Sequence, residues 1–437
     1  MQLPIRVLTT VFCCVVTLVG VRAQSPVDSA TLILSVEYRP RTEFRYGYRQ
    51  LPATGSEPAF FTSHRARINV DYAFQKFRLY ASLQDIRVWG EEDTRDPAGD
   101  AQFFEFYAEP RIAPNLKARI GRQVISYADE RLFASNNWRQ AGGKHDALRL
   151  MFQKPGLNMD FIAAFNQTRA RNFGTLYDPG FDFYKVLLAH FFSWQLSDPI
   201  KLVGINFADA YQDAEGNRKT HFKYTQGGIL TAQLPAARFT LSAYYQHGRT
   251  ESGEQLRAWY IDPQVSFSAG KNHRINLGVQ VFSGDADPND GISEAFLAQY
   301  GAFHRYNGRM DYTERTVRTY NHSGILNPYL IQDFKFTPKW GLIWESHLLG
   351  TTTPIRSTSN GIYNGHKRIY GWENDLRFRY KPNSFTSIEL AYLFMFANEK
   401  LTLLPAGAGG NVDILPQFAY LEITWTPELF RHRSKAK

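Results

Sequence analysis

The stretch from Thr62 to Trp89 alternates polar and apolar residues with a period of two. Side chains of a β-strand point alternately to opposite faces, so this stretch predicts a hairpin with one charged face and one apolar face. A soluble β-sandwich would hide such an apolar face in a core. The polar face contains Arg65, Arg67, Asn69 and Asp71, and the apolar face contains Ala66, Ile68, Val70 and Tyr72.

The same hairpin pattern recurs to the end of the chain and predicts eighteen strands. Short turns rich in proline, such as Ala113-Pro114 and Lys154-Pro155, alternate with longer polar connections. This asymmetry is typical of an outer-membrane barrel, whose closure pairs every backbone group. A β-solenoid would need a fixed repeat, and the sequence has none. The predicted strands are 31–44, 59–73, 76–89, 101–112, 115–128, 143–153, 156–168, 181–193, 200–212, 219–234, 237–249, 255–269, 271–284, 324–337, 338–350, 366–381, 384–398 and 416–426.

The first residues read as an export signal and not as part of the fold. Arg6 is followed by the apolar run Val7 to Val21 and by Val21-Arg22-Ala23, so we predict a signal peptide over residues 1–23. An uncleaved membrane anchor is the alternative. Cys13 and Cys14 are the only cysteines, which removes disulfides and thiolate metal sites from the mature chain. The fold class is therefore all-β, with one transmembrane antiparallel barrel of about eighteen strands in residues 24–437.

Charge gives little support for a nucleic-acid partner. The formal net charge is +9, but the signal and the tail after Phe430 hold six basic residues, which leaves about +3 for residues 24–430. No stretch after residue 23 has the 18 or more consecutive apolar residues that a spanning helix needs.

Charged residues share the polar faces of several strands and predict a charged lumen. Such groups set the field that selects solutes in a pore. The alternative is a salt-bridge lattice that only stiffens the interior, and both can hold together. The basic members are Arg39, Arg41, Arg65, Arg67, Arg377 and Arg379, and the acidic members are Glu37, Glu43, Asp71, Glu373 and Asp375.

A second concentration of polar residues follows Gly121. The alternation breaks there, which predicts a glycine bulge that re-aims Arg122. Arg131 lies a few residues later, with Trp138 and the segment His145-Asp146-Ala147 beyond it. This region is interpreted as a constriction or rim site, with ordinary loop anchoring as the alternative.

Signals for catalysis or cofactors are weak. Asn321-His322-Ser323 offers a hydrolase-like His/Ser pair, but the sequence identifies no acidic residue that would orient the histidine. No catalytic residue is therefore assigned. Asp285 and Asp287 resemble the start of a calcium loop, but the twelfth position is Phe296 instead of glutamate. A looser calcium site near Asp285 and Asp287 stays an expectation, and no other metal or cofactor is predicted.

Four segments together resemble the bacterial alginate export family. They are Glu37-Tyr-Arg-Pro-Arg-Thr-Glu43, Arg65-Ala-Arg-Ile-Asn-Val-Asp-Tyr72, Ser82-Leu-Gln-Asp-Ile-Arg-Val-Trp-Gly90, and Gly121-Arg-Gln123 with Arg131 and Trp138. The resemblance implies an outer-membrane barrel channel for an anionic polysaccharide. By motif position it also implies that Arg39, Arg41, Arg65, Arg67, Arg122 and Arg131 attract the polyanion. The basic heptapeptide after Phe430 departs from the usual barrel ending.

Three functions follow from these observations. The first is an outer-membrane channel that passes anionic sugars or polysaccharide through an arginine-lined lumen. The alternatives are a general diffusion porin with weak selectivity and, third, a barrel hydrolase. The expected partners are outer-membrane lipid, an anionic saccharide solute and periplasmic secretion or uptake proteins, without nucleic acid.

Overall fold

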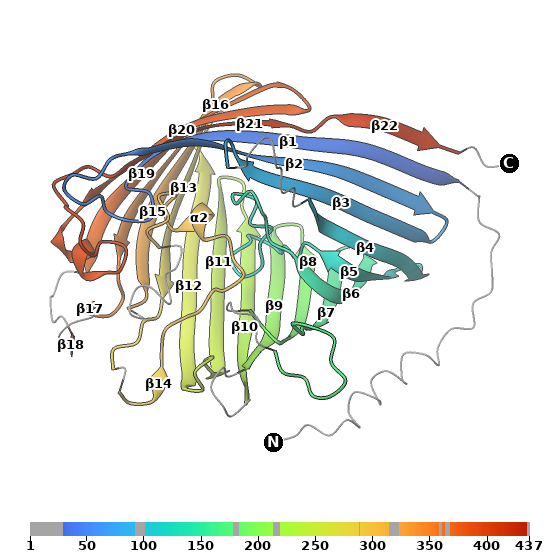
Figure 1. Ribbon diagram of the computed structural model, residues 1–437, viewed down its shortest axis with the longest axis horizontal. Coiled ribbons are helices and arrows are strands. Elements are labelled where there is room, and N and C mark those ends of the chain that lie inside the picture. Colours follow the sequence, from blue (N-terminus) through green and yellow to red (C-terminus); the bar gives the residue numbers. More distant parts are fainter. Residues whose placement is uncertain are drawn as a thin grey trace.

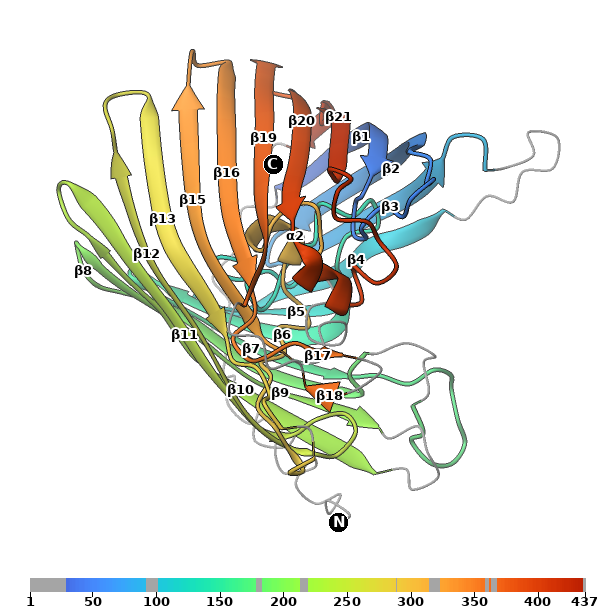
Figure 2. The same cartoon turned by 90° about the vertical axis from the view of Figure 1, so that its left-hand side faces the viewer.

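The chain forms a closed antiparallel β-barrel in which the first and last strands pair (Figures 1 and 2). The structure is a computed structural model that describes residues 29–91, 101–177, 183–212, 219–287, 289–313, 323–357, 361–362 and 368–434. The predicted signal peptide, residues 1–23, lies outside these ranges. The prediction of an all-β barrel of eighteen strands is confirmed, counting the interrupted last strand once.

Each wall strand pairs with the next along the chain. The strands are β1 (Ala30–Tyr46), β2 (Ala59–Phe74), β3 (Phe77–Val88), β4 (Gln102–Ala113), β5 (Leu116–Gln123), β6 (His145–Lys154), β7 (Leu157–Phe165), β8 (Val186–Ser197), β9 (Ile200–Gln212), β10 (Thr220–Gln233), β11 (Ala237–Arg249), β12 (Gln255–Ser268), β13 (His273–Phe282), β15 (Ile325–Lys335), β16 (Trp340–Gly350), β19 (Ile369–Asn383), β20 (Thr386–Ala397), and β21 (Gln417–Trp425) with β22 (Glu428–Arg433).

In the described parts of the loops, the elements are short. They are β14 (Ile292–Ser293), β17 (Arg356–Ser357), β18 (Gly361–Ile362), the helical turn α2 (Phe303–Tyr306) and the 3-10 helix Glu399–Leu403. Within the described ranges, the helical segments are too short and too polar to cross a membrane.

The basic tail takes part in closing the barrel. β21 and β22 both pair with β1, and Pro427 separates them. Because the carbonyl of Pro427 accepts a hydrogen bond of 3.2 Å from the amide of Val36, the seam stays paired across the interruption. Leu34 lies opposite Phe430 and Thr31 opposite Arg433. The predicted last strand, 416–426, was therefore too short.

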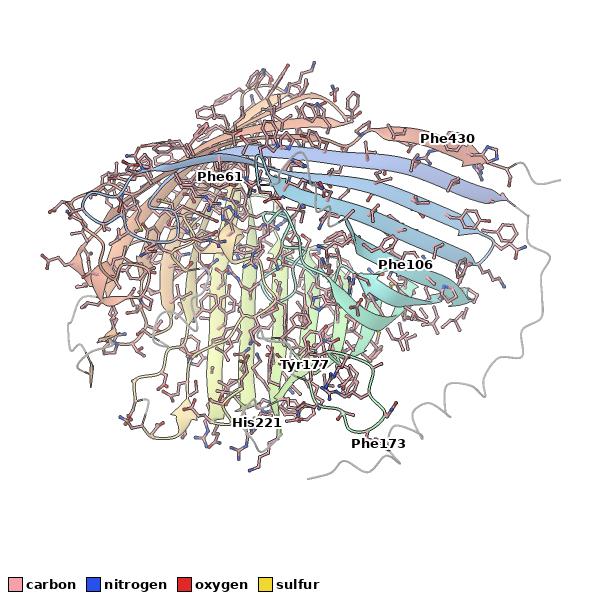
Figure 3. All side chains as sticks on the ribbon, viewed as in Figure 1. Phe61, Phe106, Phe173, Tyr177, His221 and Phe430 are labelled. Atoms are coloured by element: carbon pink, nitrogen blue, oxygen red, sulfur yellow. The ribbon has the colours of Figure 1, made fainter. Side chains whose placement is uncertain are left out.

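The alternation along each strand separates a polar lumen from an apolar outer surface. Arg65 is only 1% exposed within the barrel, whereas Ile68, three residues later, is 51% exposed on the outside. Exposed aromatic residues such as Phe106 and Phe430 belong to the same outer surface (Figure 3). So much exposed apolar surface suits a protein surrounded by lipid.

Short and long connections alternate around the ring as the sequence predicts. Only two residues join β2 to β3, β4 to β5 and β6 to β7. At the other end of the strands, the long connections include residues 124–144 and 283–324. Figure 2 shows α2, which belongs to the second of these, within the ring of strands. We call residues 124–144 and 283–313 the two inner loops.

Two predictions about the region of Gly121 were wrong. The predicted strand 115–128 ends at Gln123, because the Glu105 carboxylate accepts a hydrogen bond of 2.8 Å from the amide of Val124 as the chain leaves the wall. No bulge exists at Gly121, whose pairing with β4 runs in unbroken register. Its φ of +125° has another cause: a Cβ at this position would lie 2.4 Å from the carbonyl oxygen of Phe106.

Deleting residues 428–437 is expected to prevent stable barrel closure, because the first residues of β1 lose their hydrogen-bonded partner. The measurement is the mobility difference between heated and unheated samples in gel electrophoresis. A matched deletion of residues 435–437 leaves β22 intact and should keep the folded band. An unchanged folded band from the larger deletion would show that β22 is dispensable for closure.

Candidate functional site

Most of the sequence-predicted site residues lie on the lumen side of the wall. The arginines at 39, 41, 65, 67 and 377, with Glu43, Glu373 and Asp375, are buried there. The other three acidic and basic wall residues are partly exposed. Glu37 pairs with Arg65, Asp71 with Arg78, and Arg379 with Asp333.

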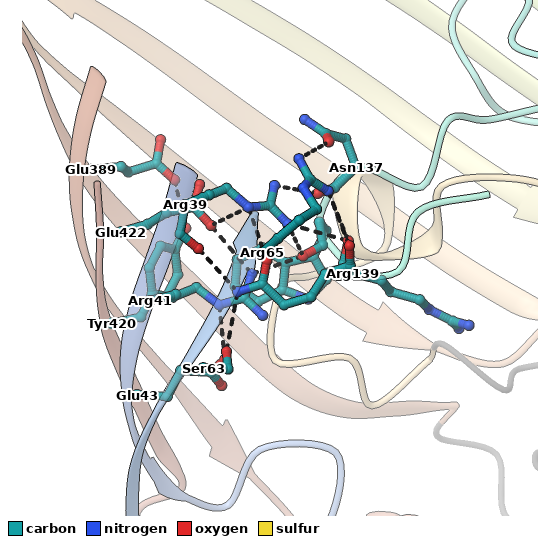
Figure 4. Close-up of polar contacts among 12 residues, drawn as sticks. Arg39, Arg41, Glu43, Ser63, Arg65, Asn137, Arg139, Glu389, Tyr420 and Glu422 are labelled. Atoms are coloured by element: carbon teal, nitrogen blue, oxygen red, sulfur yellow. Dashed lines mark hydrogen bonds and ion pairs between the residues drawn. The ribbon is translucent and has the colours of Figure 1, made fainter. Parts of the chain in front are cut away.

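The arginines of β1 and β2 bind the backbone of the first inner loop. Arg39 donates to the carbonyl oxygens of Asn137 at 2.5 Å and Arg139 at 3.2 Å, and Arg41 donates to that of Trp138 at 2.8 Å. The guanidinium of Arg65 reaches the carbonyl of Gln140 at 3.2 Å. Figure 4 shows these guanidinium groups converging on the loop.

Each guanidinium offers five donors in a rigid fork, so one side chain can hold several carbonyl groups at once. The remaining donors are taken by wall acids: Arg41 contacts Glu43 at 2.8 Å and Arg65 contacts Glu37 at 2.8 Å. Arg67 donates to Gln84 at 2.7 Å and lies 3.5 Å from the ring centre of Phe104. Arg39, Arg41 and Arg65 therefore hold the first inner loop, and their action on a solute stays a prediction.

Acidic residues on β19, which only β20 and β21 separate from β1, bind the second inner loop in the complementary way. Glu373 accepts a hydrogen bond from the amide of Met310 at 2.7 Å, and Asp375 accepts one from the amide of Arg309 at 3.1 Å. The side chain of Arg309 contacts Glu345 on β16 at 2.8 Å. Arginines thus hold carbonyl groups of one loop, while carboxylates hold amide groups of the other.

A glutamine makes a third attachment. The Gln246 side chain on β11 donates to the carbonyl of Leu297 at 2.8 Å and accepts from its amide at 2.7 Å. The side-chain amide therefore pairs with the loop as a neighbouring strand would.

The remaining two predicted arginines lie elsewhere. Arg131 is buried in the first inner loop, where it donates to Asn307 at 3.3 Å and lies 4.0 Å from the ring centre of Tyr306. The prediction that Arg122 lines the pore was wrong. Its neighbours Gly121 and Gln123 face inward, so Arg122 points outward and pairs with the exposed Asp146 at 2.9 Å.

A pocket of about 220 Å³ lies where the two inner loops meet the wall. Four arginines and two glutamates line it, which gives these groups a net charge of +2. The sequence analysis missed Arg139, Arg305 and Arg309, because they lie in connections without strand periodicity. The charged lining residues are Arg39, Arg139, Arg305, Arg309, Glu130 and Glu422, with His304, Trp138 and Asn137 beside them.

At least three of the four arginines of the pocket form ion pairs, and Arg309 pairs with Glu345 at 2.8 Å outside the lining. Arg305 contacts Glu130 at 3.2 Å, and Arg39 contacts Glu422 at 3.6 Å. The Arg139 side chain extends away from the wall arginines in Figure 4, and both Arg139 and Arg305 are solvent-exposed. These two guanidinium groups are therefore accessible to a solute in the lumen.

Asp311 is a buried acid of the second inner loop. It accepts a hydrogen bond from the Tyr48 hydroxyl and contacts His304 Nδ1 at 2.7 Å, with Arg49 at 3.5 Å. Burial raises the pKa of Asp311 to about 6, in spite of these contacts. His304 in turn stacks on Trp138 of the first inner loop, with ring centres 3.8 Å apart. The titration of Asp311 therefore acts where the two loops touch.

The weaker chemical predictions have separate outcomes. Asn321 and His322 lie outside the described residues, and the Ser323 hydroxyl donates to the carbonyl of Pro354 at 3.2 Å. Asp285 and Asp287 each accept a hydrogen bond from the amide two residues further on. In the described part of the chain these two acids belong to no group of three metal-ligating side chains. The loop calcium site stays a prediction.

These features define a porin-like channel of the bacterial outer membrane, with a lumen that inward-folded loops narrow. The chain belongs to the alginate export family, whose sequence profile matches residues 31–397. A search of curated protein sequences found no match.

Solved structures of porins share the fold. OccAB1 of Acinetobacter baumannii is 12% identical with a TM-score of 0.63, covering 91% of this chain and 97% of that one. OccK5 (OpdH) of Pseudomonas aeruginosa is 12% identical with a TM-score of 0.59, covering 93% and 100%. OccK2 (OpdF) of the same organism, solved in complex with glucuronate, is 12% identical with a TM-score of 0.59, covering 91% and 98%.

Replacing Arg39 and Arg65 by lysine together is expected to release the first inner loop while keeping the wall charge. Each hydrogen bond from a charged donor contributes about 1.5–3 kcal/mol, and a lysine cannot reproduce the fork. Single-channel recordings should show higher conductance and more frequent current fluctuations. Arg78→Lys is the control, because Arg78 donates its hydrogen bonds to the wall residue Asp71 and, in the described residues, to neither inner loop. Wild-type currents in the double variant would show that the charge alone matters.

The stability of the barrel should depend on pH through Asp311. Its pKa is raised in the folded state, so the folded protein holds the proton more tightly than the unfolded chain. The ionised form of Asp311 therefore destabilises the folded state above pH 6, and this destabilisation disappears as pH falls towards 4. The difference is up to about 3 kcal/mol.

Urea unfolding in detergent between pH 4.5 and 7.5 tests this dependence by comparing wild type with Asp311→Asn. The wild type should gain stability relative to the variant as pH falls. The test compares how the free energy of unfolding changes with pH in the two proteins. A loss of stability that the substitution causes equally at every pH does not affect it. Parallel slopes would contradict the assignment to Asp311.

Proposed function

We propose that this outer-membrane channel passes anionic sugars, as monomers or as single polysaccharide chains. The observation that carries the proposal is the pocket between the inner loops, where four arginines face two glutamates. Two inner loops narrow the lumen there, so a solute that crosses the barrel passes close to these groups.

The chemistry of the pocket suits a carboxylate on a sugar. Arginine binds a carboxylate through two parallel hydrogen bonds, and in a partly desolvated lumen this attraction exceeds its value in bulk water. Arg139 and Arg305 are exposed, so binding there stays weak enough for release.

The family of this chain and a protein of related fold also support an acidic sugar as the solute. Membership of the alginate export family favours an acidic polysaccharide or its fragments as the solute. The related fold of OccK2 was solved with glucuronate, which is itself an acidic sugar. Glucuronate and oligouronates are therefore the solutes to test first.

We also propose that the chain is a channel and not an enzyme. The hydrolase alternative needs an activated Ser323, but that hydroxyl is buried and donates to a backbone carbonyl. Such a serine has no base to take its proton among its contacts in the described residues.

Substituting Arg139 and Arg305 by alanine together should weaken anion preference. Removing two of four positive charges changes the pocket from +2 to neutral, so block by oligouronates should weaken by about tenfold, most clearly at low salt. Reversal potentials and current block in planar bilayers measure the effect. Arg238→Ala, in the short-turn rim, is the matched control. If the double variant keeps wild-type selectivity and block, the proposed solute class is wrong.

A further inference from the structure

Three buried side chains on neighbouring wall strands form a group with metal-ligand chemistry. Glu345 and His347 lie on β16 and Asp375 on β19, and their ligand atoms all lie within 4.8 Å of one another. All three are at most 3% exposed. Two bonds of about 2.1 Å to one zinc ion span at most about 4.2 Å, so small side-chain movements would bring the three onto a single ion.

The hydrogen bonds of His347 leave one ring nitrogen for a ligand. The amide group of Asn327 donates to Gln280 Oε1 at 3.2 Å and to the carbonyl of Tyr306 at 3.1 Å. Its oxygen therefore faces His347 Nδ1, 3.2 Å away, and accepts the proton of that nitrogen. Nε2 then carries the lone pair, and this buried atom has no hydrogen-bond partner. A metal-binding histidine usually donates the proton of its other ring nitrogen to a fixed acceptor, which sets the tautomer.

The carboxylates keep unused acceptor atoms. Asp375 Oδ1 and Glu373 Oε2 are buried without a hydrogen bond. Glu345 Oε2 receives one hydrogen bond, from Arg309 Nε at 2.8 Å, so one of its lone pairs is free for a metal. Buried acceptors without a partner are costly, which indicates that a cation or a proton satisfies them.

The charge of the cluster suits a divalent cation, although two protons would balance it equally, and the unpartnered nitrogen of His347 is what favours the metal. Four carboxylates face two guanidinium groups, so the fully ionised cluster carries a charge of −2. One divalent cation would neutralise it. The cluster comprises Glu345, Glu373, Asp375, Glu389, Arg309 and Arg377.

We propose that a divalent transition-metal ion, with zinc as the type, binds Glu345, His347 and Asp375 in the lumen wall. One imidazole nitrogen with two carboxylates suits zinc, whereas magnesium and calcium prefer oxygen ligands alone. The same strand holds the second inner loop, through Glu373 to Met310 and Asp375 to Arg309. The ion therefore stiffens the attachment of this loop, whichever solute the channel carries.

The test uses the purified full-length barrel in detergent, treated with EDTA and then dialysed against zinc chloride. Metal analysis should find about one zinc per folded chain, and zinc should raise the thermal unfolding midpoint. His347→Gln keeps an amide that can bond Asn327, and Asp375→Asn keeps an acceptor for the Arg309 amide. Both should weaken zinc binding by at least about tenfold.

His145→Gln is the matched control, since His145 is also a buried strand histidine but bonds to Tyr184 and does not belong to the group of Glu345, His347 and Asp375. It should bind zinc as the wild type does. The absence of zinc binding by folded wild type would overturn the proposal. A proton would then satisfy the unpartnered acceptors of Glu373 and Asp375. Equal zinc binding by the wild type and both ligand variants would also overturn it, as would magnesium competing at equal concentration.

Discussion

The architecture of this channel depends on buried wall charges that bind the backbone of inward-folded loops. A loop inside a barrel places amide and carbonyl groups away from bulk water, and each such group needs a partner. The wall meets this need with two groups of opposite chemistry, one on β1 and β2 and the other on the nearby strand β19. Arg39, Arg41 and Arg65 donate to carbonyl groups, and Glu373 and Asp375 accept from amides. Charged partners make these attachments about twice as strong as neutral ones.

The face of each wall residue could be predicted from the sequence, but its partner could not. Strand periodicity placed Arg65 and Arg67 inside and Ile68 outside, because alternate residues of a strand share a face. The loop partner of Arg65, Gln140, lies 75 residues away in a connection with no periodicity. Nothing local to Arg65 distinguishes a guanidinium that meets a solute from one that meets a carbonyl group.

Some of the missed features did leave a signal. Glu373 and Asp375 share a face two residues apart, and two such acids in a buried wall require donors from elsewhere. That requirement indicated a basic or amide-rich loop in the lumen, which is the role of Arg309 and Met310. Arg122 was mispredicted for a different reason. A glycine with positive φ is compatible both with a bulge and with close approach to a neighbouring strand, and only the pairing register separates the two.

The wall arginines use most of their donors within the protein, whereas two loop arginines are exposed, and this difference has a consequence for selectivity. A guanidinium that already donates to two carbonyl groups and a wall carboxylate has few donors left, and its charge is largely compensated. Arg65, with Glu37 and Gln140 as partners, is of this kind. Arg139 and Arg305 are carried by the loops that the wall arginines and acids hold in place, and both are exposed. Under the proposed function, wall charge acts on a solute mainly through geometry, because it fixes the loops whose side chains would meet the solute. In such a barrel, changes in loop sequence can alter the solute without disturbing the wall, whereas loss of a wall arginine removes the frame on which any selectivity is built.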